Sequence, residues 1–552
     1  MPKPWWNASG RVARPNFRRV DGFLDIAYAG GFFFLLKTFK DFCMNDCLSC
    51  FSLSHKKMHK NPPLLRWSIG LAVVVLLTSG CALQQRPPEQ VSAPMPAAWQ
   101  SALPHGGQPV AIADWWQSAV PVAEGPLLAE LVAAAQAVSP SVAAARSRIA
   151  QARAAQTSAG AALLPSLSGN ASASRSRSQI VASGGAGDGS SGASAPIAGT
   201  LQAGVQAQWE IDLFGGNAAA QNASTARLLG ADAQWHEARV SVAAEVAGLY
   251  NRLRTCRQQA ALSAADATSR SETARLSALS TRAGFTAPAL DALARASAAD
   301  ARNRSIRQRT VCELDMQALT ALTGLDGAVL RQKVAATPEI PAQAAMLSIA
   351  NDSRFLALPS VPAEALAQRP DIYSAARDVA AASFDVGSAD AARYPRLSLN
   401  GSIGALRIAV GGSAASTATW SIGPLALAVP IFDGGRSKAN LQAAQARYDE
   451  AAAQYRAKVR GAVREVEEAL LNLQTSAGQA SDAQTAAAGY TAAFTGTEAR
   501  YKNGLASLVE LEDARRTQLA AREALVLLAA ERTTAWIALY RAVGGGWAAP
   551  AP

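Results

Sequence analysis

Two proline-free stretches of about 67 residues each constrain the fold of this chain more than any other feature. The first runs from Gly216 to about Arg282 and contains only two further glycines, Gly230 and Gly248. At 1.5 Å per residue, a helix of this length extends for roughly 100 Å. Its apolar residues recur at alternating spacings of four and three, which is typical of helices that pack side by side with a left-handed twist. They are Val242, Val246, Leu249, Leu253, Cys256 and Ala260.

The second stretch belongs to an internal repeat whose two copies lie about 220 residues apart. Asp212-Leu213-Phe214-Gly215-Gly216 corresponds to Ile431-Phe432-Asp433-Gly434-Gly435, and Gly284 corresponds to Gly504. Each half is predicted to contain a helix, a strand, a loop, a strand, the long helix, a tight turn and a returning helix. The repeat therefore predicts one duplicated module rather than three or four ordinary domains. The apolar spacing recurs at Val459, Val463, Val466, Leu470 and Leu473.

The segments around the first long helix are predicted from their composition. The Ala-rich stretch 127–162 is expected to be helical. Residues 166–177 and 200–213 alternate small or polar with apolar side chains, as half-buried strands do. The Gly/Ser-rich residues 178–198 join these strands as a loop. After the turn, the chain returns as a helix over 289–322, and we expect the two shorter helices to stack end to end along the long one.

The net charge of +11 is concentrated near the N-terminus. Residues 1–66 carry 11 Lys and Arg against 4 acids, which gives +7, and the rest of the chain carries only +4. Within this region, 58–80 combines a basic start with an apolar stretch from Trp67 to Leu77 and small residues before Cys81. An apolar stretch this short is typical of a cleaved signal peptide. The basic excess therefore indicates export, and nucleic acid is not an expected partner.

The end of this signal, Thr78-Ser79-Gly80-Cys81, resembles the lipobox of bacterial lipoproteins. The resemblance implies a mature chain that begins at a diacylated Cys81, and Ala82 after it favours sorting to the outer membrane. An ordinary signal peptide followed by an incidental cysteine is the alternative. Residues 1–57 precede a normal start, so we interpret them as a misread upstream extension. The predicted mature parts are a lipid-anchored linker over 81–122, two repeats over 123–345 and 346–545, and a tail over 546–552.

Two cysteines lie at matching distances from the predicted tip of the first hairpin. Cys256 precedes Gly284 by 28 residues, and Cys312 follows it by 28. Residues that face each other in an antiparallel hairpin are equidistant from its tip, so the two thiols are expected to meet. An oxidising compartment then favours a disulfide, whose loop closure contributes on the order of 4 kcal/mol. Two buried free thiols are the alternative.

Four strands per chain cannot close a sheet in lipid, because an open edge leaves backbone groups unpaired. The smallest single-chain membrane barrels have eight strands. The predicted fold is therefore mainly α with β: duplicated long helical hairpins plus two strands per repeat. As a trimer these form a 12-stranded outer-membrane β-barrel on an α-helical periplasmic barrel. Trp209, Trp420 and Phe432 lie at strand ends, where membrane-interface aromatics are expected, although packing in a buried core is nearly as good an explanation.

Several motifs resemble those of the TolC-like outer-membrane factors, specifically the NodT-type lipoproteins that serve resistance–nodulation–division efflux pumps. Besides the lipobox and the two glycine-centred tips, these are Trp115-Trp116 and Pro430-Ile431-Phe432-Asp433-Gly434-Gly435-Arg436. Residues 365–372 match the family signature Leu-x-x-Arg-Pro-Asp-Ile, with Gln368 where arginine is commoner. The resemblance covers about 81–545, and implies a homotrimer that spans the outer membrane and extends across the periplasm.

The resemblance also assigns roles to residues near the two tips. It implies that the turns at Gly284 and Gly504 dock a periplasmic adaptor protein and an inner-membrane efflux pump. Glu510 and Asp513 are three residues apart, hence on one helical face, and would form carboxylate rings at the periplasmic gate. The alternative is that these acids only complement the dipole at a helix N-terminus.

Two further residues belong to the implied gate. Tyr501 matches the gating tyrosine of the family, but Ala506 occupies the position of its arginine partner. A lock built on that pair is therefore not expected here. Asp291 is the nearest equivalent acid in the first half.

The predicted function is the outer-membrane channel of a tripartite efflux system that exports drugs or other small molecules through a trimeric conduit. Alternatives are the channel of a type I protein-secretion system and, less well supported, a periplasmic adaptor lipoprotein, which would have only one hairpin. Only His105 and His236 lie beyond Cys81, and no catalytic motif or metal-ligand spacing occurs. No enzymatic activity, cofactor or metal is expected, and outer-membrane lipid is an expected partner.

Overall fold

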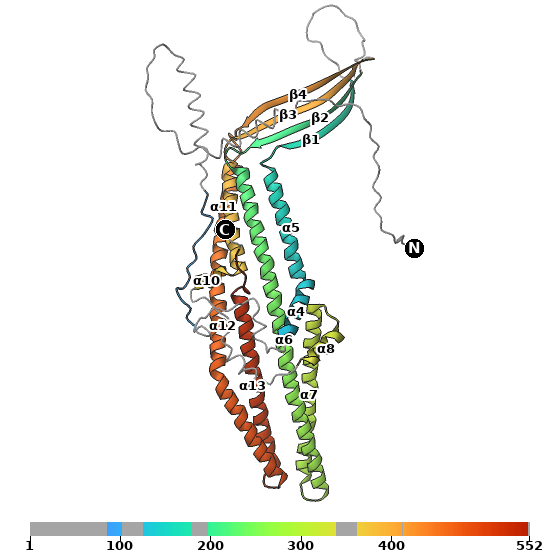
Figure 1. Ribbon diagram of the computed structural model, residues 1–552, viewed down its shortest axis with the longest axis vertical. Coiled ribbons are helices and arrows are strands. Elements are labelled where there is room, and N and C mark those ends of the chain that lie inside the picture. Colours follow the sequence, from blue (N-terminus) through green and yellow to red (C-terminus); the bar gives the residue numbers. More distant parts are fainter. Residues whose placement is uncertain (1–85, 102–124, 178–196, 338–361, 411, 550–552) are drawn as a thin grey trace, which may run out of the picture. The chain divides into compact units, whose positions relative to one another are not determined.

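A computed structural model describes residues 86–101, 125–177, 197–337, 362–410 and 412–549 (Figure 1). All of them lie in the second of two units of the chain, Val75–Pro552. Four sequence predictions fall on residues outside these ranges: the upstream extension 1–57, the signal peptide 58–80 with the lipidated Cys81, the Trp115-Trp116 pair, and most of the loop 178–198.

Two helices of equal length run through the described part of the chain. Helix α6 spans Gly216–Arg282 and α12 spans Arg436–Lys502, with 67 residues each. Both follow a glycine in the left-handed conformation, Gly215 with φ of 69° and Gly435 with φ of 89°. A side chain at either position would be strained, which explains the glycines of the repeated motif. The predicted bounds of the first long helix are those observed.

Each long helix turns back at a glycine and packs against a shorter antiparallel helix. Helix α7 (Pro288–Thr323) pairs with α6 to form hairpin 1, and α13 (Leu508–Ala542) pairs with α12 to form hairpin 2. Helix α6 also packs against α13, so the order across the four helices is α7, α6, α13, α12 (Figure 1). Helices α7 and α12 are therefore the two outer members of this layer.

The predicted helix over 127–162 is two helices, α4 (Gly125–Val138) and α5 (Pro140–Ala161), which meet at an angle of 53°. Ser139 caps α5, and Pro140 occupies its first turn, where proline starts a helix but cannot continue one. Both helices pack on α6, and α4 also contacts α7, as the expected stacking requires. Among the described residues no single helix could cross a membrane, and only this bent pair passes that test, by length and composition alone.

Three shorter helices complete the described elements. Helix α8 spans Gly327–Ala336 and follows α7, while α10 spans Pro362–Ala367 and leads into the second half. Helix α11 (Pro370–Ala391) packs against both long helices, α6 and α12. The largest apolar core lies where α4, α6, α7, α12 and α13 meet, and its most buried members include Leu131, Val246, Leu319, Val466 and Leu539.

The four strands form one antiparallel sheet in the order β1 (Ser166–Arg177), β2 (Ile197–Ile211), β3 (Arg396–Val410) and β4 (Ser413–Ala428). The pairing of β2 with β3 joins the two halves of the repeat. The first predicted strand has the observed bounds, and the second begins three residues earlier than predicted. The outer edges of β1 and β4 pair with no other described strand.

The two faces of this sheet differ in chemistry. The strand pairing brings exposed apolar side chains together on one face, and exposed polar side chains on the other. An apolar face that no helix covers indicates an apolar environment outside the single chain. The apolar face includes Leu167, Leu201, Val205, Ile403, Trp420 and Leu425, and the polar face includes Ser168, Asn170, Gln206, Gln208, Ser402 and Ser421.

Trp209 lies half-buried at the end of β2, where its Nε1 donates a hydrogen bond to the Leu163 carbonyl over 3.0 Å. Trp420 and Phe432 are 75% and 90% exposed. The packing alternative therefore applies to Trp209, whereas the exposure of the other two suits contact with a membrane interface.

Arg369 ties the second half together where α11 begins. Its guanidinium donates to both carboxylate oxygens of Asp371, to Glu465 on α12 and to the backbone carbonyl of Ala542, at 2.7–2.9 Å. Burial opposes the charged form of Asp371, but the hydrogen bonds from Arg369 outweigh it and keep the pKa of Asp371 below its ordinary value. The Arg-Pro-Asp motif thus joins the ends of α11 and α13 to the middle of α12.

The chain leaves α13 through Gly544, whose φ of +84° lies in the left-handed region. A Cβ there would lie 2.4 Å from the Gln368 carbonyl oxygen, so the substitution Gly544→Ala combines backbone strain with a backbone clash. We expect it to lower the free energy of unfolding by about 2 kcal/mol or more. Thermal unfolding in detergent, followed by circular dichroism, measures the change.

The matched control is Gly248→Ala in α6, where no atom lies within 4 Å of the added Cβ. This variant is expected to be as stable as the parent or about 0.5–1 kcal/mol more stable, because alanine favours helix. Equal stabilities for the two variants would contradict the close packing of Gly544 on Gln368.

Candidate functional site at the hairpin tips

The two hairpin tips share one backbone turn. Gly284 and Gly504 have φ of 81° and 74°. Each donates its N–H to the carbonyl three residues back at 3.0 Å, and the next residue donates to the carbonyl five residues back. Those next residues, Phe285 and Leu505, are 87% and 69% exposed. Both tips therefore present an apolar side chain to solvent, as an apolar docking surface would.

The predicted gate acids lie in the first two turns of α13. Ser507 caps this end of the helix, because its Oγ accepts the Glu510 N–H at 3.1 Å and also donates to the Glu510 carboxylate. Asp513 pairs with Arg516 at 2.5 Å. Both carboxylates are more than half exposed. Glu510 thus lies in the first turn of α13, a position compatible with either predicted role, and both carboxylates are accessible.

Tyr501 and Asp291 lie on different helices just above the tips. Tyr501 is half-buried and packs on an apolar cluster that includes Ala294, Leu508 and Leu511, and burial raises the pKa of its hydroxyl. Asp291 pairs through one carboxylate oxygen with Arg295, and its other oxygen is buried with no hydrogen-bond partner among the described residues. Neither residue forms a hydrogen bond or an ion pair with Glu510 or Asp513, so the structure does not bring the four predicted gate residues into one cluster.

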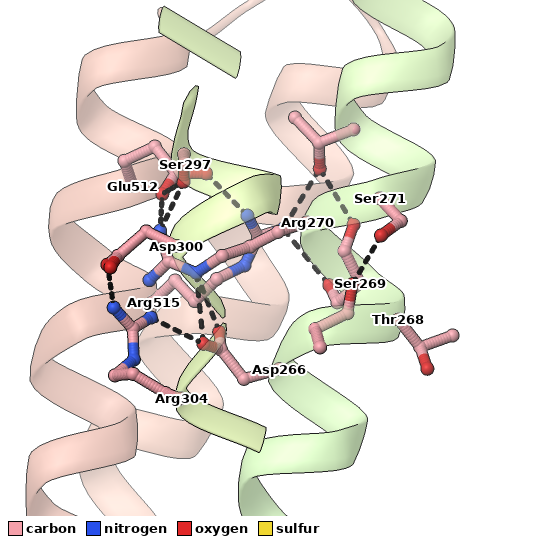
Figure 2. Close-up of polar contacts among 12 residues, drawn as sticks. Asp266, Thr268, Ser269, Arg270, Ser271, Ser297, Asp300, Arg304, Glu512 and Arg515 are labelled. Atoms are coloured by element: carbon pink, nitrogen blue, oxygen red, sulfur yellow. Dashed lines mark hydrogen bonds and ion pairs between the residues drawn. The ribbon is translucent and has the colours of Figure 1, made fainter. Parts of the chain in front are cut away.

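A buried ionic network begins at the level of the gate acids, extends away from the tips and joins the two hairpins (Figure 2). Its centre is Glu512, whose carboxylate pairs with Arg270 of α6 and with Arg515 of its own helix. Ser297 of α7 donates to the same carboxylate at 2.9 Å, and Arg270 donates to Ser297 at 2.6 Å. Glu512 therefore holds hairpin 2 against both helices of hairpin 1.

The network continues into hairpin 1 on either side of Glu512. Arg270 pairs with Asp266 at 2.9 Å, and Asp266 also accepts from Arg304 of α7. Arg515 donates to Ser269 and Thr273 at 3.0 and 3.1 Å. The side chains of Asp266 and Arg515 are only 4% and 3% exposed, so each depends on its partners rather than on water.

The residues of this ionic network were not predicted from the sequence. Asp266 with Arg270 and Glu512 with Arg515 are ordinary one-turn pairs, which are usually exposed and weak. Only the packing of α6 against α13 buries them and makes them a joint between hairpins. Glu512 also lies between the gate acids in sequence, and its inward position keeps Glu510 and Asp513 on other sides of α13.

Cys256 and Cys312 are joined in the structure, with their Cα atoms 5.5 Å apart. The bond links α6 to α7 inside hairpin 1. Cys256 and Cys312 both lie 28 residues from Gly284, and they meet across the hairpin at the position expected from the sequence.

Comparison with known proteins relates this chain to one protein family and to individual outer-membrane proteins. The profile of a family described as "Outer membrane efflux protein" matches residues 131–325 and 361–545. The chain is 32% identical over 366 residues to outer membrane protein OprJ of Pseudomonas aeruginosa, which covers 65% of this chain and 73% of OprJ. It is 29% identical to the solvent efflux pump outer membrane protein SrpC of Pseudomonas putida, over 86% of this chain and 97% of SrpC.

The fold is similar to that of a solved outer-membrane protein. The crystal structure of VceC from Vibrio cholerae superposes with a TM-score of 0.64 at 27% identity, covering 78% of this chain and 98% of VceC. The similarity includes almost all of VceC, so it extends over the hairpins and the sheet together.

Removal of Arg270 should weaken the joint between the hairpins. The substitution Arg270→Met leaves the carboxylates of Asp266 and Glu512 buried without their shared guanidinium, which is expected to lower the free energy of unfolding by about 3 kcal/mol. Arg275→Met is the control, because Arg275 pairs with Glu272 on the surface of the same helix, and its removal should leave the stability nearly unchanged. Thermal unfolding distinguishes them, and equal effects would contradict a buried joint.

The disulfide is tested by peptide mapping without reductant. We expect one linked pair of peptides that contains Cys256 and Cys312. The double substitution of both cysteines by serine should lower the free energy of unfolding by about 4 kcal/mol, since the bond closes a long loop in the unfolded chain. Alkylation of both thiols in the unreduced, unfolded protein would show that the bond does not form.

Proposed function

Because the chain belongs to the outer membrane efflux protein family, we propose that three copies of it form one continuous conduit from the periplasm to the outside of the cell. Its relatives include outer-membrane components of efflux pumps. The chain is accordingly an outer-membrane efflux channel component with a large helical periplasmic part.

The observation that carries the proposal is the sheet with two unpaired edges and one uncovered apolar face. Unpaired backbone groups are too costly to expose to lipid, so the edges of β1 and β4 must pair with another copy. Three copies supply twelve strands and remove every edge in a closed β-barrel. The apolar face would then contact lipid, and the polar face would line a water-filled interior.

The helices below the sheet favour the same assembly. Three copies of the layer α7, α6, α13, α12 place twelve helices around one axis. In each copy, α4 and α5 continue beyond the end of α7 along α6. Helices of 67 residues make such a tube roughly 100 Å long. Transport through it is passive, and neither hydrolysis nor a bound cofactor is part of the mechanism.

The names of relatives support small-molecule export. SrpC is named for a solvent efflux pump. By analogy, we propose that this channel serves a tripartite pump for drugs or other small molecules, with a periplasmic adaptor and an inner-membrane pump as partners. The exposed apolar side chains Phe285 and Leu505 at the tips are the proposed contacts with the adaptor.

At the gate, Glu510 and Asp513 of three copies would form two rings of carboxylates near the tips. Rings of this kind attract cations and bind divalent ions at close range. The Arg270–Glu512–Arg515 network takes the place of the tyrosine–arginine lock that Ala506 rules out, because it joins the hairpins at the same end. Tyr501 and Asp291 support this end by packing and pairing on neighbouring helices.

Lipidation of Cys81 remains part of the proposal. The described residues begin five positions later, at Arg86, whose guanidinium lies 4.5 Å from the Phe384 ring on α11. The intact mass of the purified protein tests both the acyl group and the start of the mature chain. A mass that includes residues 1–57 would contradict the proposed start.

The channel and its gate are tested together in planar lipid bilayers. The parent protein is expected to conduct, with currents reduced by millimolar divalent cations. Replacing Glu510 by Gln and Asp513 by Asn removes six negative charges per trimer, so cation preference and divalent block should both fall several-fold.

Lys502→Gln is the matched control, because it removes an exposed charge that pairs with Glu498 on the same helix. Its divalent block should equal that of the parent. Unchanged block in the double variant would remove the two acids from the gate, and absence of any conductance from the parent would contradict the channel itself.

A further inference from the structure

The two outer helices each have a second face that packs against no other described helix. On α12, residues on the side away from α13 recur at spacings of three and four, and all are exposed. This is the spacing by which one helix packs along another. The residues of this free face are Gly478, Asp482, Thr485, Gly489 and Ala492.

Helix α7 has a corresponding free face on the side away from α6. Its residues are also exposed and also recur at spacings of three and four. A helix with packing faces on two opposite sides is suited to lie between two neighbouring helices. Within the four-helix layer of one copy, each outer helix has only one such neighbour. The residues of this face are Ala296, Ala299, Asn303, Arg307, Thr310 and Leu314.

The charges on these two faces are opposite. Asp482 is the only charged residue between Glu468 and Glu498, and it lies at the centre of the free face of α12. On α7, Arg307 lies on the free face, and Asp300 lies on the same side seven residues earlier, where it is 61% exposed and pairs with Arg304. Neither Asp482 nor Arg307 makes an ion pair with another described residue, unlike Arg295, which pairs on α7 itself with Asp291.

The two charges also lie at the same height. Arg307 follows the tip glycine Gly284 by 23 residues, and Asp482 precedes the tip glycine Gly504 by 22. Both tips have the same turn, and α7 runs away from its tip while α12 runs toward it. When the tips of neighbouring copies are level, the two side chains face each other about 35 Å above them.

We propose that Arg307 of each copy pairs with Asp482 of the next copy around the trimer, and that this pair fixes the vertical register of the copies. The inference rests on the trimer proposed above and names its helical interface. The contact joins two different faces, so it repeats around a ring and closes. Because Arg307 and Asp482 have no ion-pair partner among the described residues of one copy, their pairing between copies selects a single register, since a vertical slip leaves both charges unpaired.

A second copy fits these faces better than a different protein does. The free faces lie on the two outer helices, run in opposite directions and carry opposite charges at equal heights. The same copies must also meet along the unpaired edges of β1 and β4. Contact at the sheet therefore brings α7 and α12 of neighbouring copies together.

Cross-linking tests the position of the contact. The full chain with Arg307→Cys and Asp482→Cys is oxidised in detergent with copper phenanthroline and run on gels without reductant. We expect covalent dimers and trimers, which reductant dissolves. The control pairs Asp482→Cys with Arg309→Cys, because residue 309 lies two positions along α7 and points away from the free face, and it should give at least ten-fold less product.

Charge reversal tests the energy of the contact. Arg307→Glu or Asp482→Arg alone places like charges in three interfaces and should lower the fraction of trimer at a fixed protein concentration roughly ten-fold. The two substitutions together restore opposite charges and should restore the trimer. A structural defect in either variant alone would not be repaired in this way.

The outcomes separate this inference from the proposed function. A parent protein that is monomeric and does not conduct contradicts the trimer. A parent that is trimeric and conducts, with no cross-link at 307 and 482 and no effect of charge reversal, contradicts only the Arg307–Asp482 pair. A cross-link to a different protein would also overturn the pairing between copies.

Discussion

The backbone at the two outer edges of the sheet imposes the constraint from which the rest of this molecule follows. Strands β1 and β4 pair with no other described strand on their outer sides, and the sheet has an apolar face that no other described element covers. In lipid, unpaired N–H and C=O groups are costly enough to exclude an open edge. A single copy is therefore incomplete, and the long helices that continue from the strands must gather around the same axis as the sheet.

Duplication explains how one chain meets this constraint from two similar halves. The pairing of β2 with β3 merges two hairpins of strands into one sheet, and α6 packs against α13 to merge the two helical hairpins. One polar joint, Glu512 with Arg270, holds the two halves together near the tips, whereas Arg369 ties α11, α12 and α13 of the second half together near the middle of α12. The joint at Glu512 is therefore the polar contact that bears on whether the hairpins separate at their tips.

Much of the architecture could be predicted because it depends on local chemistry. The absence of proline fixed the bounds of α6, and equal distances from Gly284 brought Cys256 to Cys312. The break between α4 and α5 was missed because alanine on both sides outweighed Ser139 and Pro140, which together start a helix. The network at Glu512 could not be predicted, since its partners come from helices more than 200 residues apart. Arg369 was visible as a motif, but its contact with the Ala542 carbonyl required the fold.

The oligomeric state of the purified protein in detergent tests the central claim most directly. Mass measured by light scattering, together with electrophoresis of heated and unheated samples, separates the possibilities. The closed twelve-stranded assembly predicts a species of three chains that migrates as a compact band and dissociates to one chain only on heating. A single chain in the unheated sample, in detergent that preserves its circular dichroism spectrum, would contradict it, because the edges of β1 and β4 would then be stable unpaired.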